Sequence, residues 1–168
     1  MKKFLAMFCV LSAPFFLAGC QNAVDSQIPK IDSNIESNVK ISSQETEYSF
    51  KVFHSPEGLT TVSFISPQNL KDFTISRNGG KFEVTQGGLQ AEYMKDPLPQ
   101  NAAVKYFMDV LDALSSEERN FNLKKQEEGE KTYKGTIENS ECEVVLNNKG
   151  NIIRISAQNP AMEAEFEG

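Results

Sequence analysis

Apolar and polar residues alternate along most of the chain, and this alternation restricts the possible folds more than any other feature. In one segment Tyr48, Phe50 and Val52 face one way, while Ser49 and Lys51 face the other. A period of two residues is typical of strands that bury one face. The same pattern recurs in residues 59–66, 72–77, 81–85 and 89–93. With a further candidate around residues 39–43, six consecutive strands are predicted.

Short glycine-containing turns separate these segments. They are Pro56-Glu57-Gly58, Asn78-Gly79-Gly80 and Gly87-Gly88. Glycine supplies the positive φ angles, and proline the fixed φ angle, that tight reversals use. The sequence therefore predicts antiparallel hairpins without a parallel crossover.

The period changes after Pro97-Leu98-Pro99. Between Gln100 and Ser115 apolar residues recur at spacings of three and four, as in an amphipathic helix. Alternation then returns in five further candidates, around residues 121–123, 133–137, 142–146, 153–157 and 162–166. A sheet of about ten or eleven strands must curl. We therefore predict an α+β domain, in which a strongly curved, unclosed antiparallel half-barrel wraps around one main α-helix.

The first nineteen residues are typical of a secretion signal. Two lysines precede an uncharged stretch that is too short to cross a bilayer comfortably and ends in Leu17-Ala18-Gly19-Cys20. This ending resembles the lipobox of bacterial prolipoproteins. The resemblance implies cleavage between Gly19 and Cys20 and acylation of the Cys20 thiol, for example with palmitate. We expect a protein anchored in the cell membrane on its extracytoplasmic face, or in the outer membrane of an organism that has one.

Removal of residues 1–19 leaves 149 of the 168 residues, which is the length of one domain. Residues 20–37 are mostly polar and are predicted to form a lipidated tether, followed by a single domain over residues 38–168. Loss of Lys2 and Lys3 changes the net charge from −6 to −8. Without a basic cluster, nucleic-acid binding is not expected, and the acyl chains rather than the protein surface should contact the membrane.

The domain also resembles the LolA-like fold of lipoprotein carriers and their mycobacterial relatives, which are half-barrels that cup an apolar cavity. A similar order of turns is found in lipobox-bearing lipoproteins of Gram-positive anaerobes. The resemblance covers about residues 38–167 and depends on Pro67-Gln68-Asn69-Leu70, on Gly79-Gly80 followed by Gly87-Gly88-Leu89, and on Pro97-Leu98-Pro99. It implies a fold and an affinity for acyl chains. Known carriers are soluble and have more helix, so no ligand residue is transferred.

Residues with catalytic or metal-binding chemistry are few. The single histidine, His54, is interpreted as a solvated turn residue, and without a second histidine or a cysteine pair no usual zinc site is possible. The acidic pairs Glu117-Glu118, Glu127-Glu128 and Asp109 with Asp112 are interpreted as solvated charges. Cys142 is predicted to be a small buried residue. We therefore expect no catalytic residue, no metal, no cofactor and no enzyme activity.

The concave face of the predicted sheet is the best candidate site. It combines four aromatic residues of the strands with three residues of the helix, namely Phe64, Phe73, Phe82, Tyr93, Phe107, Val110 and Leu111. If the helix leaves a gap, this apolar cup would bind a lipid or a lipidated molecule. If the helix fills the cup, the residues are core, and the protein is a structural or protein-interaction module whose partner is another envelope protein.

Overall fold

The structure is a computed structural model that describes residues 26–44, 46–99 and 102–167. The predicted signal segment and the predicted lipidation site Cys20, with the preceding Gly19, lie outside these residues. Within them, a 3-10 turn (Gln68–Leu70) accompanies one α-helix and eleven strands: β1 (Ile35–Ser43), β2 (Thr46–His54), β3 (Leu59–Ser66), β4 (Thr74–Asn78), β5 (Lys81–Gln86), β6 (Leu89–Tyr93), α1 (Ala103–Ser115), β7 (Phe121–Glu127), β8 (Glu130–Ile137), β9 (Ser140–Asn147), β10 (Ile152–Gln158) and β11 (Ala161–Glu167).

The strands form a single antiparallel sheet in the order β6-β5-β4-β3-β2-β1-β11-β10-β9-β8-β7. This order is two meanders, β1–β6 and β7–β11, joined where β1 pairs with β11 through Val39↔Phe166 and Ile41↔Ala164. The sheet does not close, because β6 and β7 lie at its two ends. The prediction of an unclosed antiparallel half-barrel with one helix is confirmed.

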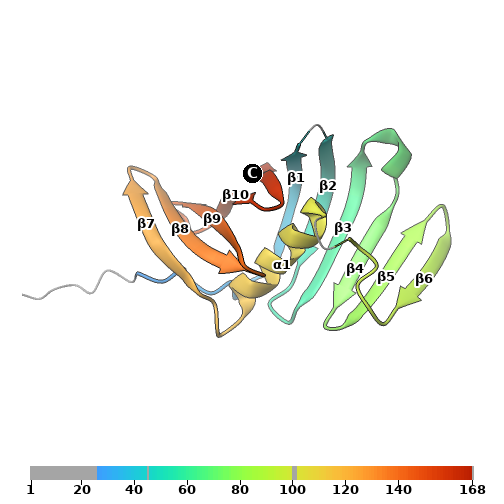
Figure 1. Cartoon of the computed structure of the whole chain (residues 1–168), viewed down its shortest axis with the longest axis horizontal. Coiled ribbons are helices and arrows are strands. Elements are labelled where there is room, and N and C mark those ends of the chain that lie inside the picture. Colours follow the sequence, from blue (N-terminus) through green and yellow to red (C-terminus); the bar gives the residue numbers. More distant parts are fainter. Residues whose placement is uncertain (1–25, 45, 100–101, 168) are drawn as a thin grey trace, which may run out of the picture.

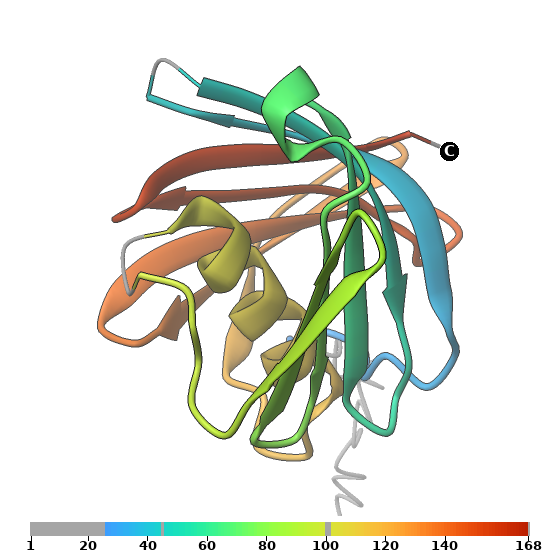
Figure 2. The same ribbon diagram turned by 90° about the vertical axis from the view of Figure 1, so that its right-hand side faces the viewer.

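Helix α1 connects one edge strand, β6, to the other, β7, and so crosses the concave face of the sheet (Figure 1). Figure 2 shows the sheet curving around this helix. The helix begins at Ala103, three residues later than the Gln100 predicted, and the residue before it, Ala102, is extended. Ten of its thirteen residues are buried, so it is enclosed over much of its circumference.

The core lies between α1 and the concave face. Val39, Phe50 and Val62 of neighbouring strands are almost completely buried, as are Phe107 and Leu111 of the helix. Burial of such side chains contributes about 1.5–3 kcal/mol each. The alternation seen in the sequence therefore corresponds to the two faces of the sheet.

Gly135 of β8 allows a close approach of the Phe121 ring. A Cβ atom at position 135 would lie 2.4 Å from Cδ1 of Phe121, whose residue is paired with Gly135 across β7 and β8. The absence of a side chain at this position lets Phe121 be buried at 1% exposure.

Residues 26–37 belong to the domain instead of to the polar tether predicted for residues 20–37. Gln27 forms an isolated bridge with Asn122 of β7, Ile28 is buried, and β1 already begins at Ile35. The physical reason is that Ile28, Ile31 and Ile35 contribute apolar side chains that pack against the core. We call residues 28–37 the strap.

Candidate functional site

The residues predicted to line an apolar cup pack against one another. Phe107, Val110 and Leu111 of α1 have no exposed surface. The rings of Phe107 and Phe50 lie 5.4 Å apart between centroids, and the ring of Phe64 lies 5.7 Å from that of Phe50. These distances are within the range of contacting aromatic pairs. The helix therefore fills the space that a ligand would have occupied at this position.

The remaining cup candidates continue this core toward β6. Phe64 and Phe82 are buried, Phe73 is half-buried, and the rings of Phe64 and Phe73 are 5.9 Å apart. Tyr93 is different, because it lies on the edge strand β6 and is 43% exposed. The alternation predicted its face correctly, since it pairs with Phe82, but the helix does not extend over this edge of the sheet (Figure 1).

A pocket of about 590 Å³ lies elsewhere, between the strap, the end of α1, the β9–β10 turn and the end of β11. Among the described residues it lies beside a gap in the sheet. The last pair between β1 and β11 joins Asn38 to Glu167, whereas β1 extends three residues further, to Ile35, and pairs there with β2. On the other side of the gap β10 begins at Ile152. The pocket occupies the space between these two strands.

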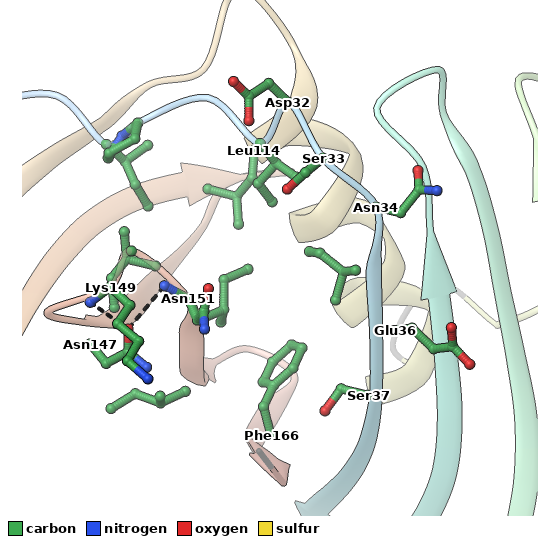
Figure 3. A pocket seen from close by; sticks show the side chains of 18 of the residues that line it. Asp32, Ser33, Asn34, Glu36, Ser37, Leu114, Asn147, Lys149, Asn151 and Phe166 are labelled. Atoms are coloured by element: carbon green, nitrogen blue, oxygen red, sulfur yellow. Dashed lines mark hydrogen bonds between the residues drawn. The ribbon is translucent and has the colours of Figure 1, made fainter.

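The pocket is lined by apolar and by polar residues in similar numbers. Its apolar side chains are Ile28, Ile31, Ile35, Leu114, Leu146, Ile152, Ile153 and Phe166. In Figure 3 Phe166 and Leu114 point into the cavity from opposite sides, while Asp32, Asn34 and Glu36 lie along its border. Lys149 is at the rim on the β9–β10 turn and is exposed.

Hydrogen bonds hold both sides of the pocket. In the strap, the amide of Ile28 donates to the Phe121 carbonyl at 3.0 Å, and that of Ile31 donates to the Leu114 carbonyl at 3.2 Å. On the opposite side, the Asn147 side-chain oxygen accepts from the amides of Lys149 and Asn151. The pocket is thus built into the fold by backbone contacts, and a large part of its wall comes from the strap.

Sequence reasoning missed this pocket, because the strap was assigned to the tether. A signal was present: Ile28, Ile31 and Ile35 recur at spacings of three and four residues in a mostly polar segment. A flexible tether has no reason to carry isoleucines at such intervals.

A second cluster of polar residues is buried between α1 and strands β2–β4. His54 has no exposed surface, and its Nδ1 and Nε2 atoms lie 2.8 Å from Thr60 Oγ1 and 2.7 Å from Ser115 Oγ. The interpretation of His54 as a solvated turn residue is therefore wrong. The residue is the last of β2 and lies on the concave face, where the helix covers it.

Acidic residues of the helix take part in this cluster too. Asp109 accepts from Arg77 at 2.5 Å and from Lys105 at 2.6 Å, and Asp112 Oδ2 lies 2.9 Å from Arg77 Nη2. Asp109 and Asp112, interpreted as a solvated pair, are instead partners of a buried arginine. Because Arg77 is 5% exposed, its charge requires such partners.

The cluster brings a serine, a histidine and an aspartate together, which is the composition of a hydrolytic triad. Burial and the nearby Arg77 charge lower the pKa of His54 to about 4, so the neutral imidazole is a weak base. Ser115 is itself buried. The geometry is therefore that of a structural network, in which both ring nitrogens of His54 have a hydroxyl partner and Arg77 Nη1 donates to Asp109.

Other reactive groups are similarly enclosed. Cys142 is buried as predicted, and burial raises the pKa of its thiol to about 11. Tyr106 donates to the Ser140 carbonyl. Within the described part of the chain, no group of three or more histidine, cysteine, aspartate or glutamate residues has the geometry of a metal site. No helix there has the length and apolar character needed to span a bilayer.

No protein family matches the chain, and no curated protein does. Solved structures are similar to it in fold. An uncharacterized conserved protein from Thermus thermophilus has a TM-score of 0.52 at 12% identity, over 81% of this chain and 77% of that one. This likeness concerns the fold alone.

Two further structures are more distant. One is the CwlD amidase from Clostridioides difficile in complex with the GerS lipoprotein, with a TM-score of 0.43 and 15% identity over 78% of this chain and 81% of that chain. The other is a LolA superfamily protein from Nitrosomonas europaea, with a TM-score of 0.37 and 12% identity over 84% and 67% of the two chains.

Proposed function

We propose that this protein is a non-catalytic bacterial lipoprotein, anchored to a membrane through Cys20, that binds an acyl chain in the pocket beneath the strap. The observation that carries this proposal is the pocket itself. Its volume of about 590 Å³ lies in the range of small-molecule sites. Eight isoleucine, leucine and phenylalanine residues line it, and these are the side chains that an acyl chain would contact.

The position of the pocket supports a ligand that comes from the membrane. Cys20 precedes Ile28, the first residue of the strap, by eight residues, which span at most about 28 Å when extended. A lipidated Cys20 would thus hold the pocket within that distance of the membrane. The exposed ammonium of Lys149 at the rim would contact the carboxylate or phosphate head group of the ligand.

The absence of catalysis is part of the proposal. His54 and Ser115 are buried in the network under α1, and neither belongs to the residues that line the pocket. A ligand bound beneath the strap would therefore meet apolar side chains and backbone rather than a nucleophile and a base.

The test is binding of palmitate to the full chain, measured by native mass spectrometry and by isothermal titration calorimetry. We expect one palmitate per chain. The double variant Ile31→Asn/Ile153→Asn replaces two half-buried pocket residues by polar ones of similar size. Each change removes about 1–2 kcal/mol of apolar contact, so the affinity should fall at least tenfold.

The matched control is Ile65→Asn, the same change at an exposed position of β3 that is outside the pocket. It should leave the affinity unchanged. Equal loss in the control variant, or no palmitate bound by the unmodified chain, would contradict the proposal.

A second candidate function is a protein-interaction module of the cell envelope. It is favoured by the packed interior, in which Phe107 and Leu111 leave no room for a lipid, and by the stretch of β1 that extends past its last pair with β11. In this case, an extended segment of a partner protein would fill the pocket. Native mass spectrometry separates the two functions, because the chain would then be free of lipid.

A further inference from the structure

The two edges of the sheet differ in how they are protected from pairing with another strand. Residues 26–28 lie along the first part of β7, where the Leu123 amide donates to the Ser26 carbonyl and the Ile28 amide to the Phe121 carbonyl. The rest of β7 carries Lys124, Lys125 and Glu127. A covering segment and charged side chains are the usual means by which proteins prevent edge pairing.

Strand β6 is less protected among the described residues, because Glu92 is its only charged residue. It lies at the opposite end of the sheet (Figure 1), and all five of its residues are exposed. Leu89 is 79% exposed, and Met94 directly after the strand is 77% exposed. An edge strand also presents unpaired N–H and C=O groups with which another strand can pair.

We propose that β6 pairs with β6 of a second copy of this chain, antiparallel and centred on Ala91, to form a symmetric dimer. Pairing with β5 defines the faces of β6: Tyr93 lies opposite Phe82, and Ala91 lies opposite Val84, so Leu89, Ala91 and Tyr93 share the concave face. In the proposed register Leu89 lies opposite Tyr93 of the second copy, and Ala91 opposite its own equivalent. Two exposed apolar side chains per copy would thereby become cross-strand pairs.

The side chains on the other, polar face of β6 are also compatible with this register. Gln90 would lie opposite Glu92 of the second copy, so that an amide can donate to a carboxylate at two symmetric positions. Within one copy Glu92 lies opposite Glu83 of β5, and like charges in directly opposed positions are unfavourable. The amide from the second copy would give Glu92 a favourable neighbour on its other side.

Other symmetric registers are less favourable. A two-fold axis perpendicular to the sheet pairs a central residue with itself. With Glu92 at the centre, two carboxylates would lie directly opposite each other. With Gln90 at the centre, Tyr93 would lie opposite Gly87 in the β5–β6 turn. Only the axis at Ala91 pairs all five residues of β6.

The difference between the edges also limits the assembly. Pairing of β6 with β6 uses the same surface on both copies and therefore closes after two chains. Because β7 is covered and charged, the joined sheet would not extend into a fibre.

Disulfide crosslinking tests the register in the full chain, with Cys9 and Cys20 replaced by serine and the buried Cys142 left in place. Ala91→Cys would lie opposite its own equivalent, at the Cα separation of about 4.5–5.5 Å that a disulfide accepts. We expect a covalent dimer after mild oxidation. The matched control is Leu89→Cys on the same face, whose two copies would be four residues apart, about 13 Å, and should remain monomeric. Crosslinking of both variants to the same extent, or of neither, would overturn the proposal.

Sedimentation equilibrium of the same full chain gives a second, independent measurement. Gln90→Glu would place a carboxylate opposite Glu92 of the second copy at both symmetric positions. It should raise the dissociation constant of the dimer about three- to tenfold. Gln90→Lys at the same exposed position would pair with Glu92 and should strengthen the dimer by a similar factor. A chain that stays monomeric at all concentrations, or variants that do not differ, would show that β6 does not bind a second copy and is free for another partner.

Discussion

At the scale of single residues, His54 shows how a polar side chain is kept in this core. Its two ring nitrogens have one hydroxyl partner each, Thr60 and Ser115. A neutral imidazole has one donor and one acceptor nitrogen, so the two hydroxyls satisfy it completely. Protonation would bring a second positive charge beside the Arg77 guanidinium, which is one cause of the lowered pKa.

This arrangement predicts a loss of stability in acid. The pKa of His54 is about 4 in the folded protein and about 6.5 when the chain is unfolded. The unfolded chain therefore binds more protons between these values, and the free energy of unfolding should fall by about 3 kcal/mol as the pH is lowered from above 6.5 to below 4. Urea unfolding at a series of pH values measures this fall in the free energy of unfolding.

The control for this prediction is His54→Asn, which cannot titrate in that range. Burial raises the pKa of the neighbouring Asp112, which acts in the opposite sense, and the difference between the two pH profiles removes this common contribution. If the profiles of the two proteins run parallel between pH 4 and 6.5, His54 is not the group responsible.

At the scale of elements, helix α1 is the component on which the half-barrel depends. A curved sheet with one apolar face needs a second layer to cover that face, and α1 is the only α-helix in the described part of the chain. Phe107 and Leu111 bury it against the strands, while Asp109 and Lys105 connect its polar side to Arg77 and Glu138. The helix therefore has apolar and ionic contacts with the sheet.

We predict that Leu111→Ala lowers the free energy of unfolding by about 2–5 kcal/mol, because it leaves a cavity in a site without exposed surface. The control change Ile65→Ala, at 46% exposure on β3, should alter it by less than about 1 kcal/mol. Denaturant unfolding of both variants measures the difference. Similar losses in the two variants would mean that α1 does not stabilise the fold as its packing indicates.

At the scale of the whole molecule, the two meanders meet at β1 and β11, and the strap enters beside this junction. Gln27 and Ile28 pair with β7, Ile31 contacts the end of α1, and β1 begins at Ile35 within the strap. A tether attached upstream of the strap would thus be joined directly to the wall of the pocket. The predicted anchor and the proposed site are therefore linked by chain connectivity.

Attachment to the membrane is a prediction of the sequence, because Cys20 lies outside the described residues. Cys20→Ser removes the thiol that would be acylated, and without two or more acyl chains no stable anchor remains. The protein should move from the membrane fraction to the soluble fraction, as measured by immunoblotting after ultracentrifugation. Cys142→Ser, at a buried position, should leave it in the membrane fraction. Retention of the Cys20→Ser variant in the membrane would contradict lipidation at this residue.

The sequence by itself determined the strands, the helix and the unclosed antiparallel sheet. Period-two alternation and glycine turns are local signals, and antiparallel meanders connect neighbours in sequence, so local signals were sufficient. The faces of the strands followed for the same reason: Phe64, Phe82 and Tyr93 all lie on the concave face, as expected.

Only the tertiary structure decided which of these faces are covered and where space remains. His54 is buried because α1 crosses β2, and Tyr93 is exposed because α1 does not reach β6; neither fact is contained in the local pattern. The pocket lies between segments that are far apart in the sequence, namely the strap, the end of α1 and the β9–β10 turn. Volume and burial depend on such long-range contacts, whereas periodicity depends on neighbours along the chain.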